Sequence, residues 1–149
     1  MKTKKMFILE IIIIGLLIFL VSHFLLQICF VNGPSMEPTL KNGQMLFAKK
    51  INLKPKKNDI AVIKCNKKII IKRIIGTPND RIIIKNGNVY VNNIQFDDKK
   101  IENAGNAQEE IVLKDNQFFV LGDNRQQSID SRFDEIGIIN KDNIIGIII

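Results

Sequence analysis

An apolar N-terminal segment is the feature that most constrains how this 149-residue chain can fold. Between Phe7 and Val31 the polar residues are Glu10, Ser22, His23 and Gln27. About 20 helical residues are enough to cross the hydrocarbon core of a bilayer. The sequence therefore predicts a transmembrane anchor over residues 7–31, a basic N-terminus over residues 1–6, and one further domain over residues 32–149.

The end of the apolar segment favours an anchor that is retained. A cleaved secretory signal ends in small residues of the Ala-x-Ala kind, whereas this segment ends in Gln27-Ile28-Cys29-Phe30-Val31. Lys2, Lys4 and Lys5 favour a cytoplasmic N-terminus. We therefore expect a single-pass protein of the cell membrane, with residues 32–149 outside the cytoplasm.

Residues 32–149 are predicted to form one mainly β domain. Hydrophobic residues make up 46% of the chain and many are isoleucine, whose branching at Cβ favours strands. The predicted strands are Gln44–Lys49, Ile60–Lys64, Ile69–Ile75, Arg81–Lys85, Asn88–Asn92, Gln117–Leu121 and Asn143–Ile149. Asn86-Gly87 between two alternating segments predicts a β-hairpin. Residues 97–110 are polar and are predicted to form a mobile loop.

The net charge of +7 is concentrated in one part of the chain. Eleven Lys or Arg residues lie between Lys41 and Arg73, where Asp59 is the one acidic residue. Such a stretch is typical of a solvated face, and a face against anionic lipid headgroups is the alternative. We expect no nucleic-acid binding, because the chain has no Trp, one Tyr and an apolar anchor. Cys29 and Cys65 are not expected to pair.

Ser35 and Lys72 are candidates for a catalytic pair. The single histidine, His23, lies in the apolar segment and cannot serve a serine outside the membrane. Strand alternation places Lys72 on the face of Ile70 and Ile74, with Arg73 on the opposite face. A lysine among isoleucines has a lowered pKa, and its neutral amine can accept the proton of a serine hydroxyl. The alternative is an ordinary surface lysine on an edge strand.

A dense polar cluster over residues 122–132 follows the apolar residues Phe118–Leu121. Polar groups that enter a core need internal partners. Charged residues that could supply them as ion pairs are Arg73, Asp123, Arg125, Asp130 and Arg132. An ordinary polar loop is the alternative.

Three segments together resemble type I signal peptidases in order, spacing and content. They are Gly33-Pro34-Ser35-Met36-Glu37-Pro38-Thr39-Leu40, the strand that ends in Lys72-Arg73, and Gly122-Asp123-Asn124-Arg125-Gln126-Gln127-Ser128-Ile129-Asp130-Ser131-Arg132. The resemblance covers essentially the whole chain. It implies a compact antiparallel β peptidase domain of the signal-peptidase type with one N-terminal transmembrane helix.

The resemblance also implies roles for single residues. Ser35 would be the nucleophile, Lys72 the general base, and Ser128 would hydrogen-bond the lysine amine and orient it. Met36 would line the cleft, and the pairs Arg73–Asp123 and Asp130–Arg132 would hold the lysine strand against the loop at Gly122. Gly33 stands where some relatives have a serine that completes the oxyanion hole. Asn58, Asn79 and Asn93 stand where relatives often have glycine, and asparagine tolerates the left-handed backbone of such turns.

The implied activity is that of a membrane-anchored serine endopeptidase that removes signal peptides from exported preproteins. It would cleave after small residues at positions −1 and −3, bind its substrate along exposed strand edges, and need no metal or cofactor. Its partners would be preproteins and the lipid bilayer. The alternatives are a related Ser-Lys peptidase dedicated to one pilin-like or conjugation-related precursor, and a non-enzymatic membrane-anchored module.

Overall fold

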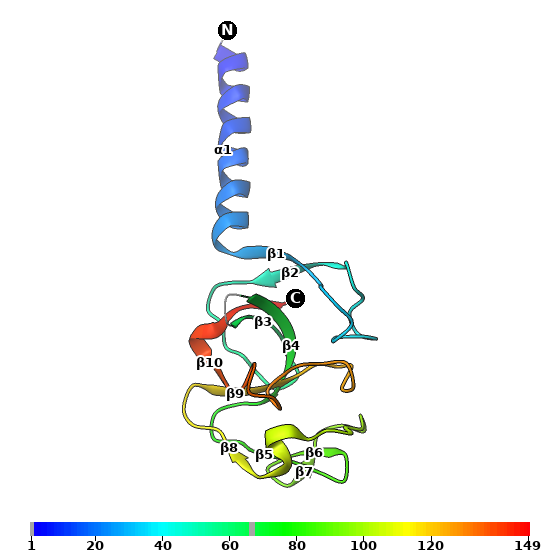
Figure 1. Ribbon diagram of the computed structural model, residues 1–149. Coiled ribbons are helices and arrows are strands. Elements are labelled where there is room, and N and C mark those ends of the chain that lie inside the picture. Colours follow the sequence, from blue (N-terminus) through cyan, green and yellow to red (C-terminus); the bar gives the residue numbers. More distant parts are fainter. Residues whose placement is uncertain (1, 66–67) are drawn as a thin grey trace.

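A long helix is followed by a mainly β domain in the computed structural model, which describes residues 2–65 and 68–149 (Figure 1). The elements are α1 (Lys2–Phe24), β1 (Leu26–Phe30), β2 (Met45–Lys49), β3 (Ile60–Cys65), β4 (Lys68–Gly76), β5 (Arg81–Lys85), β6 (Asn88–Val91), β7 (Ile94–Gln95), the 3-10 helix η1 (Gly105–Gln108), β8 (Ile111–Val112), β9 (Gln117–Leu121), β10 (Ile139–Asn140), the 3-10 helix η2 (Lys141–Asn143) and β11 (Ile144–Ile148). The mainly β prediction is confirmed.

The helix α1 ends earlier than the predicted apolar anchor. Leu26–Phe30, predicted to belong to the same segment, instead form β1, which pairs antiparallel with β2 in the register Phe30↔Met45. Leu26, Ile28 and Phe30 are aliphatic or aromatic and suit a strand as well as a helix, so tertiary pairing decides between the two. Among the residues that the structure describes, no helix is both long enough and apolar enough to cross a membrane. The predictions that concern the side chains of Lys2, Lys5 and His23 fall outside the described residues.

Two antiparallel sheets make up the β domain. The larger has seven strands in the order β1-β2-β11-β3-β4-β9-β10, and the smaller has four in the order β7-β6-β5-β8. Figure 1 shows β1 and β2 next to the end of α1, and the smaller sheet at the far end of the domain. The chain enters the smaller sheet from β4 and returns to the larger one through β9.

Isoleucine fills the core where the sheets meet. Ile75 and Ile82 are fully buried and pack with Phe119 and Leu121 between the end of the larger sheet and the smaller sheet. A second cluster lies under β1 and β2 and contains Met36, the residue after Ser35. The core of the larger sheet therefore reaches the loop that carries the candidate nucleophile.

The predicted hairpin between β5 and β6 is present. Asn86 and Gly87 have φ values of 49° and 74°, the left-handed pair that a two-residue hairpin turn requires. Asn58, Asn79 and Asn93 also have positive φ, as predicted for turns where relatives often have glycine.

Residues 97–110 differ from the polar, mobile loop that was predicted. They include η1, and both Ile101 and Ala107 are buried against the smaller sheet. The Asn106 N–H donates to the Arg132 carbonyl at 2.8 Å. Two apolar side chains thus pack this segment against the smaller sheet despite its polar composition, and its backbone contacts the loop that contains Arg132.

The Asp80 carboxylate forms hydrogen bonds with residues of three different turns. Its carboxylate accepts hydrogen bonds from the Thr77 N–H at 2.7 Å, the Thr77 hydroxyl at 2.8 Å, Asn92 Nδ2 at 2.7 Å and Lys57 Nζ at 2.9 Å. Burial alone would raise the pKa of this carboxyl, but the bonds from Thr77, Lys57 and Asn92 outweigh burial and hold the pKa below its ordinary value.

We predict that Asp80→Asn lowers the free energy of unfolding by about 1–3 kcal/mol at pH 7, because the amide cannot accept from all of these donors. The folded-state pKa is depressed, so the contribution of the carboxylate is present above pH ~4 and is lost as the pH falls through the folded pKa. Urea unfolding of the full chain at pH 7 and pH 3 should therefore show a smaller gap at pH 3. Glu109→Gln, at an exposed position, is the control, and equal effects of the two changes would contradict the role of Asp80.

Candidate active site

Ser35 lies in the loop between β1 and β2, on a tight turn. The Glu37 N–H donates to the Pro34 carbonyl at 3.0 Å, and the Leu40 N–H donates to the Met36 carbonyl at 2.9 Å. The Met36 side chain is buried in the core beneath the turn. The turn is therefore fixed from below, and Ser35 remains partly exposed above it.

Lys72 reaches Ser35 from β4. Its Nζ lies 2.6 Å from Ser35 Oγ, and the residue is 5% exposed. Burial lowers the pKa of the Lys72 ammonium; Asp130 raises that pKa and Arg132 lowers it, each by a smaller amount. The structure thus brings together the two residues that the sequence proposes as nucleophile and base, in an environment that favours the neutral amine.

The loop after β9 closes the site from a second side. The Asn124 N–H donates to the Ser35 carbonyl at 3.0 Å. A Cβ added at Gly122 would lie 2.2 Å from Ser128 Oγ and 2.5 Å from the Ser35 carbonyl oxygen, so only glycine fits between these two residues. The position of Gly122 is therefore coupled directly to that of Ser35.

Ser128 is buried beside Gly122, but it does not make the predicted hydrogen bond. Its Oγ has no hydrogen-bond partner among the described residues. A buried hydroxyl without a partner is uncommon, because burial costs the hydroxyl its bonds to water. The expected contact between Ser128 and the Lys72 amine is therefore absent from this structure.

Arg73 and Asp123 form the predicted ion pair between β4 and the loop. Arg73 Nε and Nη2 donate to the two carboxylate oxygens at 2.8 and 2.6 Å, and the Thr39 hydroxyl donates to Asp123 Oδ2 at 2.5 Å. Lys99 Nζ lies 3.4 Å from Asp123 Oδ1. Burial would raise the pKa of Asp123, but the bonds from Arg73 and Thr39 and the positive charges nearby hold it at about 2. The sequence patterns did not indicate Thr39 or Lys99.

Arg132 and Asp130 also pair, at 2.8 and 3.0 Å, but their role differs from the expectation. Arg132 donates to the carbonyls of Arg125 and Ser128, and Asp130 accepts from the Gly122 N–H at 3.0 Å. All of these groups belong to the same loop. The pair therefore holds the loop in shape, whereas Arg73–Asp123 connects the loop to the strand that carries Lys72.

A groove of about 450 Å³ runs from Ser35 between β1 and β4. It is lined by residues 27–32 on one side, by residues 68–72 on the other, and by Ser35 and Met36. β1 is an edge strand, and β9 pairs with β4 only from Arg73 onward. Both walls of the groove therefore offer strand edges that have no partner strand among the described residues.

The backbone near Ser35 bears on how an oxyanion could be held. The Gly33 N–H donates to Asn42 Oδ1 at 2.9 Å, and Gly33 has a φ of 90°, a conformation that favours glycine. The Ser35 N–H has no acceptor within the described part of the chain. Ser35 can thus supply one free donor, whereas the N–H of Gly33 is already engaged. No group of three or more His, Cys, Asp or Glu among the described residues is arranged to hold a metal ion.

The chain is similar to known proteins over most of its length. The chain is 37% identical to signal peptidase I P of Bacillus subtilis subsp. natto, over 98% of this chain and 89% of that protein. It is 31% identical to signal peptidase IB of Staphylococcus aureus (strain Mu50 / ATCC 700699), over 93% and 84%. The crystal structure of a signal peptidase I from Enterococcus faecalis V583 matches with a TM-score of 0.53 and 25% identity, over 64% of this chain and 97% of that one.

The family model described as "Signal peptidase, peptidase S26" matches residues 4–149, which is nearly the whole chain. With relatives above 30% identity along most of their length, this match shows that the chain belongs to the signal peptidase family, peptidase S26.

Proposed function

We propose that the protein is a serine endopeptidase that removes N-terminal signal peptides from exported preproteins, with Ser35 as nucleophile and Lys72 as general base. The observation that carries this proposal is the 2.6 Å contact between Lys72 Nζ and Ser35 Oγ, with the amine buried. Relatives named signal peptidase I support the substrate class.

In the proposed reaction the neutral Lys72 amine takes the Ser35 proton as Ser35 Oγ attacks the scissile carbonyl carbon. The Ser35 N–H donates to the developing oxyanion. As the C–N bond breaks, Lys72 returns the proton to the leaving amine, and an ester on Ser35 remains. Water then loses a proton to Lys72, attacks the ester and releases the new carboxylate, which restores the Ser35 hydroxyl.

We propose that the substrate lies extended in the groove and adds a strand to the edges of β1 and β4. Cys29, Val31, Met36 and Ile71 are buried and already fill the space below the groove. Shallow apolar depressions favour small side chains, in line with cleavage after small residues at −1 and −3.

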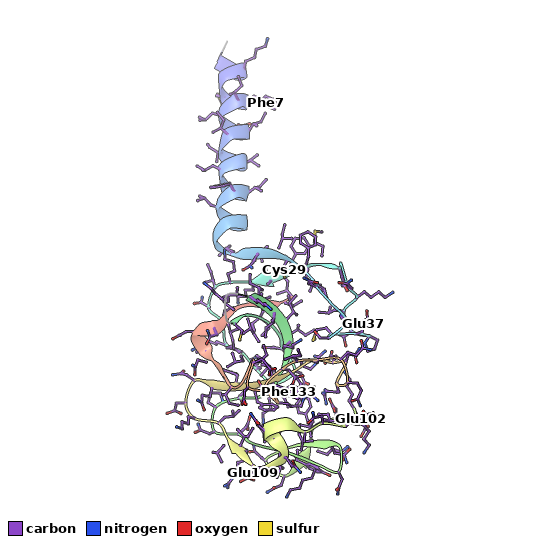
Figure 2. All side chains as sticks on the ribbon, viewed as in Figure 1. Phe7, Cys29, Glu37, Glu102, Glu109 and Phe133 are labelled. Carbon is purple, nitrogen blue, oxygen red and sulfur yellow. The ribbon has the colours of Figure 1, made fainter. Side chains whose placement is uncertain are left out.

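We also propose that the protein is attached to the cell membrane, with the β domain outside the cytoplasm. The described apolar side chains of α1 are exposed around the helix, as expected for a helix that needs an apolar environment (Figure 2). Next to its end, the strand pair β1–β2 exposes one apolar face through Ile28, Phe30, Met45 and Phe47, which are 56%, 65%, 52% and 44% exposed. Ile28 stands opposite Phe47, and Phe30 opposite Met45. Contiguous exposed apolar patches of this kind mark contact surfaces, here with lipid.

Lys72→Arg is expected to abolish precursor cleavage, because a guanidinium does not deprotonate in proteins and cannot act as the base. The assay uses the full chain in lipid vesicles and a model precursor with a signal peptide, beside Ser35→Ala as the matched inactive control. Circular dichroism checks that both variants fold. An active, folded Lys72→Arg enzyme would refute the assignment of the base, and a panel of precursors would separate a broad peptidase from a dedicated one.

Ser128→Ala is expected to lower kcat by about 10-fold to 100-fold with little change in KM, the effect of one lost hydrogen bond to a charged group. The unpartnered Ser128 hydroxyl supports such a bond to the Lys72 ammonium once the amine has taken the serine proton. Because the wild-type hydroxyl has no partner, the variant should keep its thermal stability. Steady-state kinetics with a cleavable peptide measure both constants, and unchanged kinetics would count against this role.

Removal of α1 is expected to weaken vesicle binding. The full chain should float with lipid vesicles in a density gradient, whereas a chain that begins at Leu25 should stay largely at the bottom. Labelling of Ser35 by an acylating reagent shows that the shortened chain is folded. Equal flotation of the two chains would contradict attachment through the helix.

A further inference from the structure

Arg125 is a buried cation whose role the proposed reaction leaves unexplained. Its side chain is 2% exposed. Nε donates to the Gly122 carbonyl at 3.0 Å, while Nη1 and Nη2 donate to the two carboxylate oxygens of Asp97 at 3.2 and 2.5 Å. One guanidinium thus joins the loop of the active site to a carboxylate from a different part of the chain, in the bidentate geometry of strong charge-assisted pairs.

Asp97 belongs to the segment that follows β7 in the smaller sheet. The same segment holds the loop at a second point, where Arg132 Nη1 donates to the Asn103 carbonyl at 3.0 Å. Figure 1 shows the loop after β9 between the larger sheet and the elements of the smaller sheet. Through Arg125, Asp97 therefore links the segment after β7 to the carbonyl of Gly122.

Gly122 has almost no freedom to move. Its N–H is held by Asp130 and its carbonyl by Arg125, and its Cα is closely packed between Ser128 and the Ser35 carbonyl. A shift of Gly122 would therefore displace Ser35 or open the wall of the site beside it. Misplacement of a reacting group by about 1 Å costs on the order of 100-fold in rate.

We propose that Asp97 is a positioning residue for the peptidase, acting through Arg125 and the Gly122 carbonyl to keep Ser35 in contact with Lys72. This inference rests on Ser35 and Lys72 as the reacting pair, and it does not depend on which precursors are cleaved. Loss of the Asp97 charge loosens Arg125, lets Gly122 shift and admits water to the Lys72 amine.

The pH dependence of Ser35 reactivity separates positioning from a purely structural role. The charged groups that act on Lys72 are Asp130 and Arg132, and a substitution at Asp97 removes neither. Burial is the main cause of the lowered pKa of Lys72. If water enters the site, that pKa rises, and the pH at which Ser35 becomes half-maximally reactive rises with it. A uniform loss of folded protein lowers the amplitude of labelling and leaves this midpoint unchanged.

The experiment measures acylation of Ser35 in the full chain, in detergent micelles, by a small acylating inhibitor over a range of pH. For Asp97→Asn we expect the limiting acylation rate to fall about 10-fold to 100-fold, the inhibitor constant KI to stay near the wild-type value, and the midpoint to move to higher pH. Asp97→Glu, which keeps the carboxylate, should recover part of the rate. Glu110→Gln is the matched control, because Glu110 forms an exposed ion pair with Arg81 on the same smaller sheet.

An Asp97→Asn protein with the wild-type rate and midpoint overturns the proposal. So does a protein that loses labelled fraction and melting temperature while the midpoint stays the same. If Asp97→Asn does not fold, the Arg125→Lys variant takes its place, because a lysine can pair with Asp97 but lacks the Nε bond to the Gly122 carbonyl. Arg125→Lys should also move the midpoint of Ser35 acylation to higher pH. An unchanged midpoint in this variant rejects the positioning role of Asp97. A wild-type chain that acylates but cleaves no precursor would contradict only the proposed function.

Discussion

The removal of one amine from water is the condition on which the rest of the site depends. Lys72 lies on a strand rich in isoleucine, and burial favours its neutral form. A neutral amine at this position is useful only while Ser35 stays within hydrogen-bonding distance. The fold must therefore keep solvent out of a site that also has to admit a peptide chain.

The polar loop over residues 122–132, together with apolar walls, keeps water from the Lys72 amine while the groove stays open to a peptide. Arg73–Asp123 fastens the loop to the lysine strand, and the bonds around Gly122 fix its backbone beside the serine. The charged side chains of this loop, which are Asp123, Arg125, Asp130 and Arg132, are each paired, which limits the cost of burying them. Among the buried side chains that the structure describes, the Ser128 hydroxyl is the polar group without a hydrogen-bond partner.

Local patterns in the sequence predicted much of this arrangement. The hairpin at Asn86–Gly87 and the inward face of Lys72 follow from turn chemistry and strand alternation, which depend on near neighbours. The end of α1 could not be predicted in this way, because the mostly apolar residues 26–30 suit a helix and an edge strand equally. Residues 97–110 make contacts with distant parts of the chain, among them the pair between Asp97 and Arg125, and no pattern within the segment itself indicates that contact.

Leu25 is the one residue between the end of α1 and the start of β1. The two Cα–Cα steps from Phe24 to Leu26 span at most about 7 Å, so the start of the groove wall stays close to the end of the helix. With α1 embedded in a bilayer, as we propose, the start of β1 would lie close to the lipid. The distance of a peptide bond from the bilayer would then help to decide whether that bond is cleaved, together with the side chains beside it.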